Sequence, residues 1–472
     1  MNSNVRSFLK KITYSISANL ISTLISVILS FIIPKFLGVE HYSYYQLYVF
    51  YVSYTGFFQL GWADGLQLRY GGKEYQELEA SLLHSQYWLQ VVFDLLVVGG
   101  FALYGLFVST DSNLSFIVML TGLNCLLLHP RAILQYLLHS TGRVEFYARN
   151  LIMERSLSFV FIVLMLFFGY REFEYMLLAD VASKAIALLM LSYTCRDIVV
   201  TRGVALLIGF KEAWANISAG SKLMFANIAS MLVVGVVRFA IKEAWDLETF
   251  GKVSFSLNIA NLILTFVSAV GIVVFPLIKR SKSQVFSSVY VLAGQLLSAG
   301  MYVFLILYYP IKLLICAFLP DYEEAIGYLA LLFPLCIFAA RNSLLITTYL
   351  KALREEKAML YLNLVALVFS TLVVGCTVLL LHSLVLTILS IVVLLAFKCI
   401  IADVYVQKKL GVHDVMLFVF DLLIASLFIV GNWYVGGVVG WLLYCFVLGV
   451  YFLIYKKKYT NLVVRFLRIV NE

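Results

Sequence analysis

Long apolar runs separated by short polar stretches make up most of the chain. Each run is about 20 residues or longer, which is the length a helix needs to cross the ~30 Å hydrocarbon layer of a bilayer. Helices are expected because lipid forces backbone polar groups to bond internally. The pattern predicts about fourteen transmembrane helices, over residues 12–34, 43–66, 81–108, 114–138, 149–169, 175–195, 217–241, 250–275, 286–309, 323–349, 358–381, 384–406, 415–434 and 436–455.

The composition agrees with an all-α polytopic membrane protein. The chain has 472 residues, of which 62% are hydrophobic and only 13% are charged. A soluble domain carries roughly 25% charged residues. The first apolar run, residues 12–33, is too long for a cleaved signal and lacks a small-x-small cleavage site, so we expect it to be retained as the first span.

The orientation follows from the positions of Lys and Arg in the short loops, which are enriched on the cytoplasmic side. The side assigned as cytoplasmic carries 23 of them and the opposite side carries four, on alternating loops. This asymmetry predicts that both termini are cytoplasmic. The four outer residues are Lys35, Arg171, Lys242 and Lys312, and the inner set is Arg6, Lys10, Lys11, Arg69, Lys73, Arg143, Arg149, Arg196, Arg202, Lys211, Lys279, Arg280, Lys282, Lys351, Arg354, Lys357, Lys408, Lys409, Lys456, Lys457, Lys458, Arg465 and Arg468.

A weak internal repeat divides the chain. Ala18-Asn19-Leu20 recurs as Ala226-Asn227-Ile228, and Asn150-Leu151 as Asn363-Leu364. Parallel repeats are common in transporters, with the substrate site between the halves. We therefore predict a six-helix half over 1–210, a second over 211–410, and two further helices with a basic tail over 411–472. The loops leave no room for a catalytic domain, and the absence of a phosphate-binding GxxxxGK[ST] loop argues against ATP hydrolysis.

Charged residues inside the predicted spans are the candidates for function. A charge at that depth costs at least ~2.5–3.5 kcal/mol and normally faces protein or a water-filled cavity. Cations outnumber anions there, which suits an anionic substrate. The cations are Arg131, Arg155, Lys184, Lys222, Arg238, Lys252, Arg341 and Lys398, and the anions are Asp64, Asp94, Glu154, Asp180, Asp403 and Asp421.

Four of these cations are predicted to line a cavity and bind substrate: Arg131, Arg155, Lys222 and Arg341. Arg238 and Lys252 are near span ends and can reach the headgroups instead, and Lys398 can do the same or pair with Asp403. Glu154 and Asp180 are expected to neutralise neighbours such as Arg155 and Lys184. Interrupting prolines at corresponding positions of the two halves, Pro130 and Pro334, also point to a transport site.

Asp64 is in the segment Gly61-Trp62-Ala63-Asp64-Gly65, at the inner end of the second span. Two interpretations stay open: a proton or sodium site that couples transport, or a structural cap. The seven cysteines are scattered without a CxxC pair, which favours buried small hydrophobic residues over disulfides or metal ligands. We expect no catalytic residue, cofactor or metal ion, and no nucleic-acid partner, because the basic residues lie in short loops.

Residues 18–75 carry a family resemblance. The stretch from Ile33 to Leu47, IPKFLGVEHYSYYQL, resembles the first outer loop of bacterial polysaccharide flippases of the Wzx type, as do GWADG (61–65) and LRYGGK (68–73). Lys35 replaces an arginine of the family pattern and Ser43 a glycine. The family belongs to the multidrug/oligosaccharidyl-lipid/polysaccharide exporter (MOP) superfamily.

The resemblance implies a multi-pass protein of the bacterial plasma membrane. Such a protein moves an undecaprenyl-pyrophosphate-linked oligosaccharide from the inner to the outer leaflet by alternating access. Its partners would be this lipid-linked glycan and membrane lipids, with a polysaccharide polymerase and glycosyltransferases as further partners, and it would act as a monomer. Two alternatives stay open: a multidrug or cation antiporter of the same superfamily, and a membrane polysaccharide polymerase or ligase.

The charge asymmetry generates a topology prediction. A single cysteine placed at Ser112, in an otherwise cysteine-free chain, should react with an impermeant thiol reagent added from outside the cell, because the loop before residue 114 is predicted to face outward. Labelling of this position only from the cytoplasm would overturn the orientation and the alternation of the loops.

Overall fold

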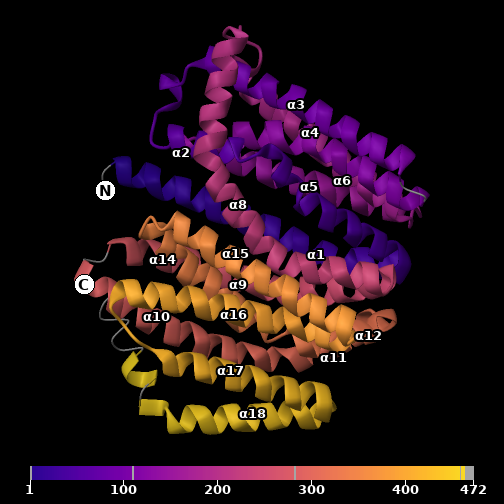
Figure 1. Ribbon diagram of the computed structural model, residues 1–472, viewed down its shortest axis with the longest axis vertical. Helices are drawn as coiled ribbons and strands as arrows, with labels where there is room; N and C mark the ends of the chain where they lie inside the picture. Colours follow the sequence, from indigo (N-terminus) through magenta and orange to yellow (C-terminus); the bar gives the residue numbers. More distant parts are fainter. Residues whose placement is uncertain (1–2, 109–110, 281–282, 458, 463–472) are drawn as a thin grey trace. The chain divides into compact units, whose positions relative to one another are not determined.

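A computed structural model describes residues 3–108, 111–280, 283–457 and 459–462, with side chains left undescribed at 3–16, 18, 263, 265–280, 283–286 and 415. Within these ranges every regular element is a helix (Figure 1). The basic residues Lys282, Lys458, Arg465 and Arg468, which contribute to the predicted orientation, lie outside the described residues.

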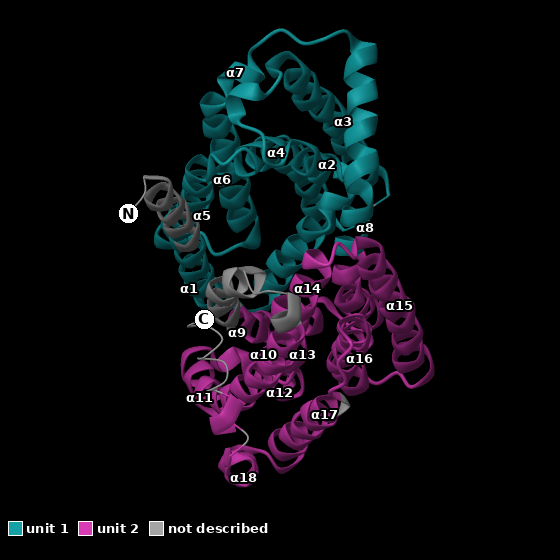
Figure 2. Cartoon of the chain, turned by 90° about the vertical axis from the view of Figure 1, so that its left-hand side faces the viewer, with its two compact units in different colours: residues 1–228 teal, residues 229–472 magenta. Residues whose placement is uncertain are grey.

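The chain divides into two units, residues 1–228 and 229–472, which are coloured separately in Figure 2. The boundary falls inside one long helix, α8. Unit 1 contains α1 (Ser3–Ser53), η1 (Thr55–Gln59), α2 (Trp62–Tyr70), η2 (Tyr75–Glu77), α3 (Ala80–Phe107), α4 (Ser112–Ser140), α5 (Val144–Phe167), α6 (Phe173–Thr194), α7 (Arg196–Val199) and the first part of α8 (Leu206–Ala244).

Unit 2 holds the rest of the chain, including the last two long helices. Its elements after α8 are α9 (Leu247–Arg280), α10 (Ser283–Phe304), η3 (Leu305–Leu307), α11 (Tyr308–Phe318), η4 (Pro320–Tyr322), α12 (Glu323–Leu332), α13 (Leu335–Ala340), η5 (Arg341–Ile346), α14 (Thr347–Ala352), α15 (Glu356–Gly375), η6 (Cys376–Leu380), α16 (Leu384–Leu410), α17 (Val415–Ile429), η7 (Val430–Val435) and α18 (Gly437–Ile454).

The described residues contain 11 helices long and apolar enough to cross a membrane, or 12 if one bent pair counts as a single span. A multi-pass membrane protein is thereby confirmed, whereas fourteen spans stay a prediction. One difference from the predicted count comes from α1, which was predicted as two spans and whose part Asn19–Gln59 is counted once. Its backbone leaves the helical path at Gly38, where φ is 72°, a conformation that glycine adopts readily. The count also leaves out α9, which carries the predicted span 250–275.

Only one of the two paired prolines interrupts its span. Pro334 separates α12 from α13, and the segments Pro320–Leu332 and Leu335–Ala352 are bent by 56°. Pro130 lies inside α4, which continues without a break to Ser140. The predicted symmetry of two interruptions is therefore wrong. Membrane helices tolerate proline where neighbouring groups satisfy the freed carbonyl.

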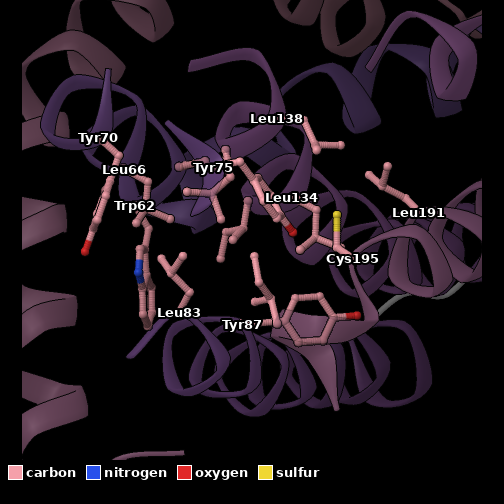
Figure 3. Packing of buried hydrophobic residues seen from close by; sticks show 14 of the residues in the cluster. Trp62, Leu66, Tyr70, Tyr75, Leu83, Tyr87, Leu134, Leu138, Leu191 and Cys195 are labelled. Carbon is pink, nitrogen blue, oxygen red and sulfur yellow. The ribbon is translucent and has the colours of Figure 1, made fainter. Parts of the chain in front are cut away.

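A buried apolar cluster forms the core of unit 1 beneath α2 (Figure 3). Trp62 and Leu66 of α2 belong to it together with residues of α3, α4 and α6, and Tyr75 and Cys195 extend it toward the loops. The Trp62 indole N–H donates to Gln86 Oε1 at 3.0 Å, so its one polar atom is satisfied inside the cluster. The cluster fixes the short helix that carries Asp64.

Three glycines allow α2 to lie directly against α8 within unit 1. A Cβ added to Gly61 would lie 2.7 Å from the backbone carbon of Gly220, and one on Gly65 would overlap the backbone of Asn216. A Cβ on Gly220 would in turn overlap the backbone of Gly61 and Gly65. Small residues four apart permit such backbone approach between membrane helices. The spacing of the GWADG segment is thus a packing requirement.

We predict that Gly65→Ala destabilises unit 1, because backbone atoms cannot move aside as a side chain would. Overpacking of this kind costs about 1–3 kcal/mol, and the midpoint of thermal unfolding of the detergent-purified protein should fall. Gly100→Ala is the matched control, since open space surrounds Gly100 on α3 and alanine is about 0.5–1 kcal/mol better than glycine inside a helix. Equal midpoints for the two variants would contradict the packing role.

Candidate substrate site

Most of the charged residues at membrane depth form ion pairs. The cations left outside these pairs are the candidates for contact with a substrate. The predicted pair Lys184–Asp180 is confirmed at 2.5 Å, whereas Glu154 pairs with Arg131 and not with its neighbour Arg155. Lys252 contacts Glu324 at 2.8 Å. Three of the eight predicted cations have no carboxylate within ion-pair distance in the part of the chain that the structure describes: Arg155, Lys222 and Lys398.

Arg131 is held between α4 and α5. Its side chain is buried, its Nε donates to Asn150 Oδ1 at 2.8 Å, and its Nη2 lies 2.7 Å from Glu154 Oε2. Asn150 is itself fixed by donating to the backbone oxygen of Ala187 on α6. Removing one partner from a buried ion pair leaves an uncompensated charge, so Arg131 and Glu154 depend on each other.

Arg155 follows Glu154 in the sequence but lies on another face of α5, because successive helical residues are turned by about 100°. Glu154 is buried, whereas Arg155 is exposed. It lies midway along α5 and close enough to Tyr45 of α1 to interact electrostatically with it. An exposed arginine so far from either helix end is expected to face a water-filled space instead of lipid.

Lys222 and Asp64 are on the two helices that the glycine contact joins, α8 and α2. Lys222 is exposed. Asp64 is partly buried in the first turn of α2 and interacts electrostatically with Tyr136 of α4. A carboxylate in a first helical turn is stabilised by the N-terminal end of the helix dipole. This placement agrees with the structural interpretation of Asp64, and its coupling role stays a prediction.

Arg341 is the centre of a buried charge cluster in unit 2. It begins the π-helical turn η5, and its side chain is 2% exposed. Nη1 lies 2.8 Å from Asp421 of α17, Nη2 pairs with Asp403 of α16, and the guanidinium lies 4.4 Å from the centre of the Phe418 ring. The two acids accept further hydrogen bonds from tyrosines, Asp403 from Tyr290 and Asp421 from Tyr302 at 2.5 Å.

The cluster also corrects the interpretation of Lys398. Asp403 pairs with Arg341, not with Lys398. The Lys398 side chain is 5% exposed and donates to Ser230, so it does not extend to a helix end. It lines a small pocket of about 20 Å³ within unit 2 together with Asn342, Thr347 and Asn363.

The four predicted substrate residues are divided between the units. Unit 1 contains Arg131, Arg155 and Lys222, with the first two on adjoining helices, and unit 2 contains Arg341. Sequence reasoning missed a buried pair in unit 1, Asp94 with His129, whose atoms Oδ1 and Nδ1 are 2.6 Å apart. The signal for it was a histidine inside an apolar run, directly before Pro130. Among the described residues no group of three or more His, Cys, Asp or Glu side chains is arranged to hold a metal ion.

Comparison with known proteins places the fold. No protein-family model matches the sequence, and no curated protein matches it. Among solved structures, an inward-facing MATE multidrug resistance transporter of the MOP superfamily aligns with a TM-score of 0.60 and 11% identity, over 84% of this chain and 94% of that one. The lipid II flippase MurJ in an inward closed conformation aligns with a TM-score of 0.59 and 13% identity, over 95% and 99%. A MATE structure in a straight conformation aligns with a TM-score of 0.57 and 11% identity, over 86% of this chain and 96% of that one.

At these identities the likeness shows the fold alone, which this chain shares with the MATE transporters and with MurJ. Membership of the MOP superfamily, and of the polysaccharide flippases within it, stays a proposal.

We predict that Arg341→Gln destabilises the protein by about 3–5 kcal/mol, because two carboxylates would be left buried without their cation. Adding Asp403→Asn and Asp421→Asn should recover much of the loss, since the amide oxygens still accept from Tyr290 and Tyr302. The measurement is thermal unfolding in detergent, with Arg202→Gln, an exposed loop cation, as the control. A triple variant no more stable than the single one would contradict the charge balance.

Proposed function

We propose that the protein is a flippase that moves an undecaprenyl-pyrophosphate-linked oligosaccharide from the inner to the outer leaflet of the bacterial plasma membrane. A pyrophosphate and its sugars cannot cross hydrocarbon unaided. The fold shared with MATE transporters and MurJ supports a transporter that makes and breaks no covalent bond. Alternating access by movement of one unit against the other would carry the head group, with fourteen spans and both termini inside.

The extent of the alignments favours a lipid substrate. The MATE structures cover 84 to 86% of this chain, whereas MurJ covers 95% of it. Helices α17 and α18 are integral to unit 2: Asp421 of α17 binds Arg341, and Tyr444 of α18 donates to the backbone oxygen of Tyr302 at 2.7 Å. Two fixed additional helices offer a surface along which a polyprenyl tail could remain in lipid.

The observation that carries the proposal is Arg155, an exposed cation midway along a membrane helix with no carboxylate partner among the described residues. With Lys222 it gives unit 1 positive charge that no carboxylate neutralises among the described residues. A pyrophosphate would neutralise it, since arginine can grip phosphate oxygens with two parallel bonds while lysine acts as a point charge. A site for cationic drugs would need the opposite sign of charge.

The four substrate residues then have different roles. Arg155 and Lys222 would contact the pyrophosphate directly. Arg131 and Arg341 would do so only when phosphate oxygens replace their present carboxylate partners, Glu154 in one case and Asp403 with Asp421 in the other. Several cations that each bind the head group with moderate affinity would also permit its release, because the same head group has to leave at the outer leaflet. Asp64 stays the candidate for ion coupling.

We predict that Arg155→Ala and Lys222→Ala abolish export while leaving protein levels intact, because neither side chain holds a carboxylate that would be orphaned. Arg155→Lys should restore export in part, since charge survives without the two-bonded geometry. Complementation of a deletion strain measures export, and immunoblotting measures the level. Arg202→Ala, in the exposed loop before α8, is the matched control. Normal export by both alanine variants would contradict the proposal that Arg155 and Lys222 bind the pyrophosphate.

We further predict that deletion leaves lipid-linked repeat units on the inner leaflet, because their head group cannot cross. Protection of these units from an impermeant glycan-modifying enzyme in intact spheroplasts measures their side. Single repeat units accumulating on the outer face would instead favour a polymerase. Drug sensitivity with normal glycan export would favour a multidrug antiporter.

A further inference from the structure

Asp94 of α3 and His129 of α4 form a buried polar group that the proposed substrate site does not use. Their side chains are 0% and 2% exposed. His129 Nδ1 lies 2.6 Å from Asp94 Oδ1, and Nε2 lies 3.1 Å from the backbone oxygen of Thr55 in η1. One imidazole therefore connects two membrane helices to the short segment that follows α1. Gln59, also in η1, donates to the backbone oxygen of His129 at 3.2 Å.

The geometry fixes where protons must be. A carbonyl oxygen only accepts, so Nε2 carries a proton toward Thr55. The 2.6 Å contact on the other side also requires a proton between Nδ1 and Oδ1, whether it belongs to an imidazolium or to a carboxylic acid. If the pair lost one proton, the neutral imidazole would keep a single N–H for two acceptors. That N–H would go to the charged carboxylate, and the lone pair of Nε2 would then face the Thr55 oxygen in a buried site, where two unpaired acceptors in contact are costly. The observed arrangement is therefore the protonated form of the pair.

The surroundings are also short of hydrogen-bond donors. Gln90 Nε2 donates to Asp94 Oδ1 at 3.1 Å. Two further buried oxygens, Asp94 Oδ2 and Gln90 Oε1, have no hydrogen-bond partner in the part of the chain that the structure describes. Buried acceptors are normally satisfied. A proton on the carboxyl group lowers the cost of this shortage, because burying a neutral carboxyl group costs less than burying a carboxylate.

No fixed cation replaces that proton. Arg131 and Arg341 balance the other buried acids, but Asp94 is within ion-pair distance of no lysine or arginine among the described residues. Among the described residues, the titratable groups that interact with Asp94 are His129 on α4 and the Cys125 thiol on the same helix, and η1 contributes the neutral Thr55 and Gln59. The charge of the pair therefore changes with its own protonation.

We propose that Asp94 and His129 form a proton-binding site whose occupancy controls the attachment of η1 to α3 and α4. With the proton bound, Nδ1 and Oδ1 are joined and the imidazole holds Thr55. With the proton released, the one remaining ring N–H stays on the Asp94 carboxylate, the contact between Nε2 and the Thr55 oxygen becomes repulsive, and η1 keeps only the Gln59 hydrogen bond to the His129 backbone. The site lies wholly within unit 1 and depends on no property of the transported substrate. The proton-binding proposal can therefore be refuted or supported independently of the proposed function.

The test follows the imidazole directly. The chain has six histidines, so 15N spectra of histidine-labelled protein in nanodiscs can be resolved, and His129→Gln identifies the signal. We expect the His129 nitrogen signals to change with pH through one midpoint in the wild type. In Asp94→Asn the midpoint should move, because the carboxylate that shares the proton is gone. Glu145→Gln, an exposed acid on α5, should leave it unchanged. An identical midpoint in Asp94→Asn and wild type would contradict the proposal that Asp94 and His129 share a proton.

A second measurement tests the attachment of η1 and does not rely on a variant of the pair. Phe57 in η1 is 44% exposed, so a 19F-labelled cysteine at this position in a cysteine-free chain reports its environment. The 19F signal should change with the same midpoint as His129, and a pH-independent signal would overturn the attachment. Both titrations are run in sodium and in choline chloride. A midpoint that moves with sodium would assign the site to a metal cation and overturn the proton assignment.

Discussion

The cost of a charge inside lipid is the constraint that orders this molecule. Every ion at that depth must find a partner, a proton or water, because hydrocarbon offers none of these. Arg131 meets the requirement through Glu154, Lys184 through Asp180, and Arg341 through two aspartates. The pairs made by Arg131 and Arg341 join helices that are otherwise held by apolar contacts with little directional preference, whereas Lys184 and Asp180 lie on the same helix, α6. The pairs therefore fix which faces meet, while the apolar residues supply the contact area.

Most of the helices could be predicted from the sequence because a spanning segment is defined by length and composition alone. The predicted segment 114–138 matches α4 and 384–406 matches α16 to within a few residues. The prediction was weakest where helices break, since a break depends on local backbone conformation. Gly38 interrupts α1 without a change in hydropathy, and Pro334 breaks its segment whereas Pro130 does not.

The charged residues of the site could be predicted from the sequence, but most of the ion pairs that they form could not. The membrane-depth charges could be read directly, and the partnership of Lys184 with Asp180, one helical turn apart, followed from spacing. Arg341 and its acids are separated by 62 and 80 residues, so no local pattern connects them. The same limit applies to Asp94 and His129, which come together only because α3 packs on α4. The GWADG segment attracted attention for its aspartate, yet its glycines explain the spacing through their contact with α8.

The charge cluster around Arg341 has a consequence for how the chain is made. Asp421 is on the second-to-last long helix, so during synthesis Arg341 and Asp403 enter the membrane before their third member exists. Arg341 and Asp403 can neutralise each other at that stage. Helix α17 then brings a carboxylate in the middle of an apolar segment, which by itself is a poor candidate for lateral release from the translocon into lipid. Its insertion is more favourable against a unit 2 that already presents Arg341, because the Asp421 carboxylate then meets its cation. A defect in an earlier helix of that unit would leave Asp421 in the membrane without this partner.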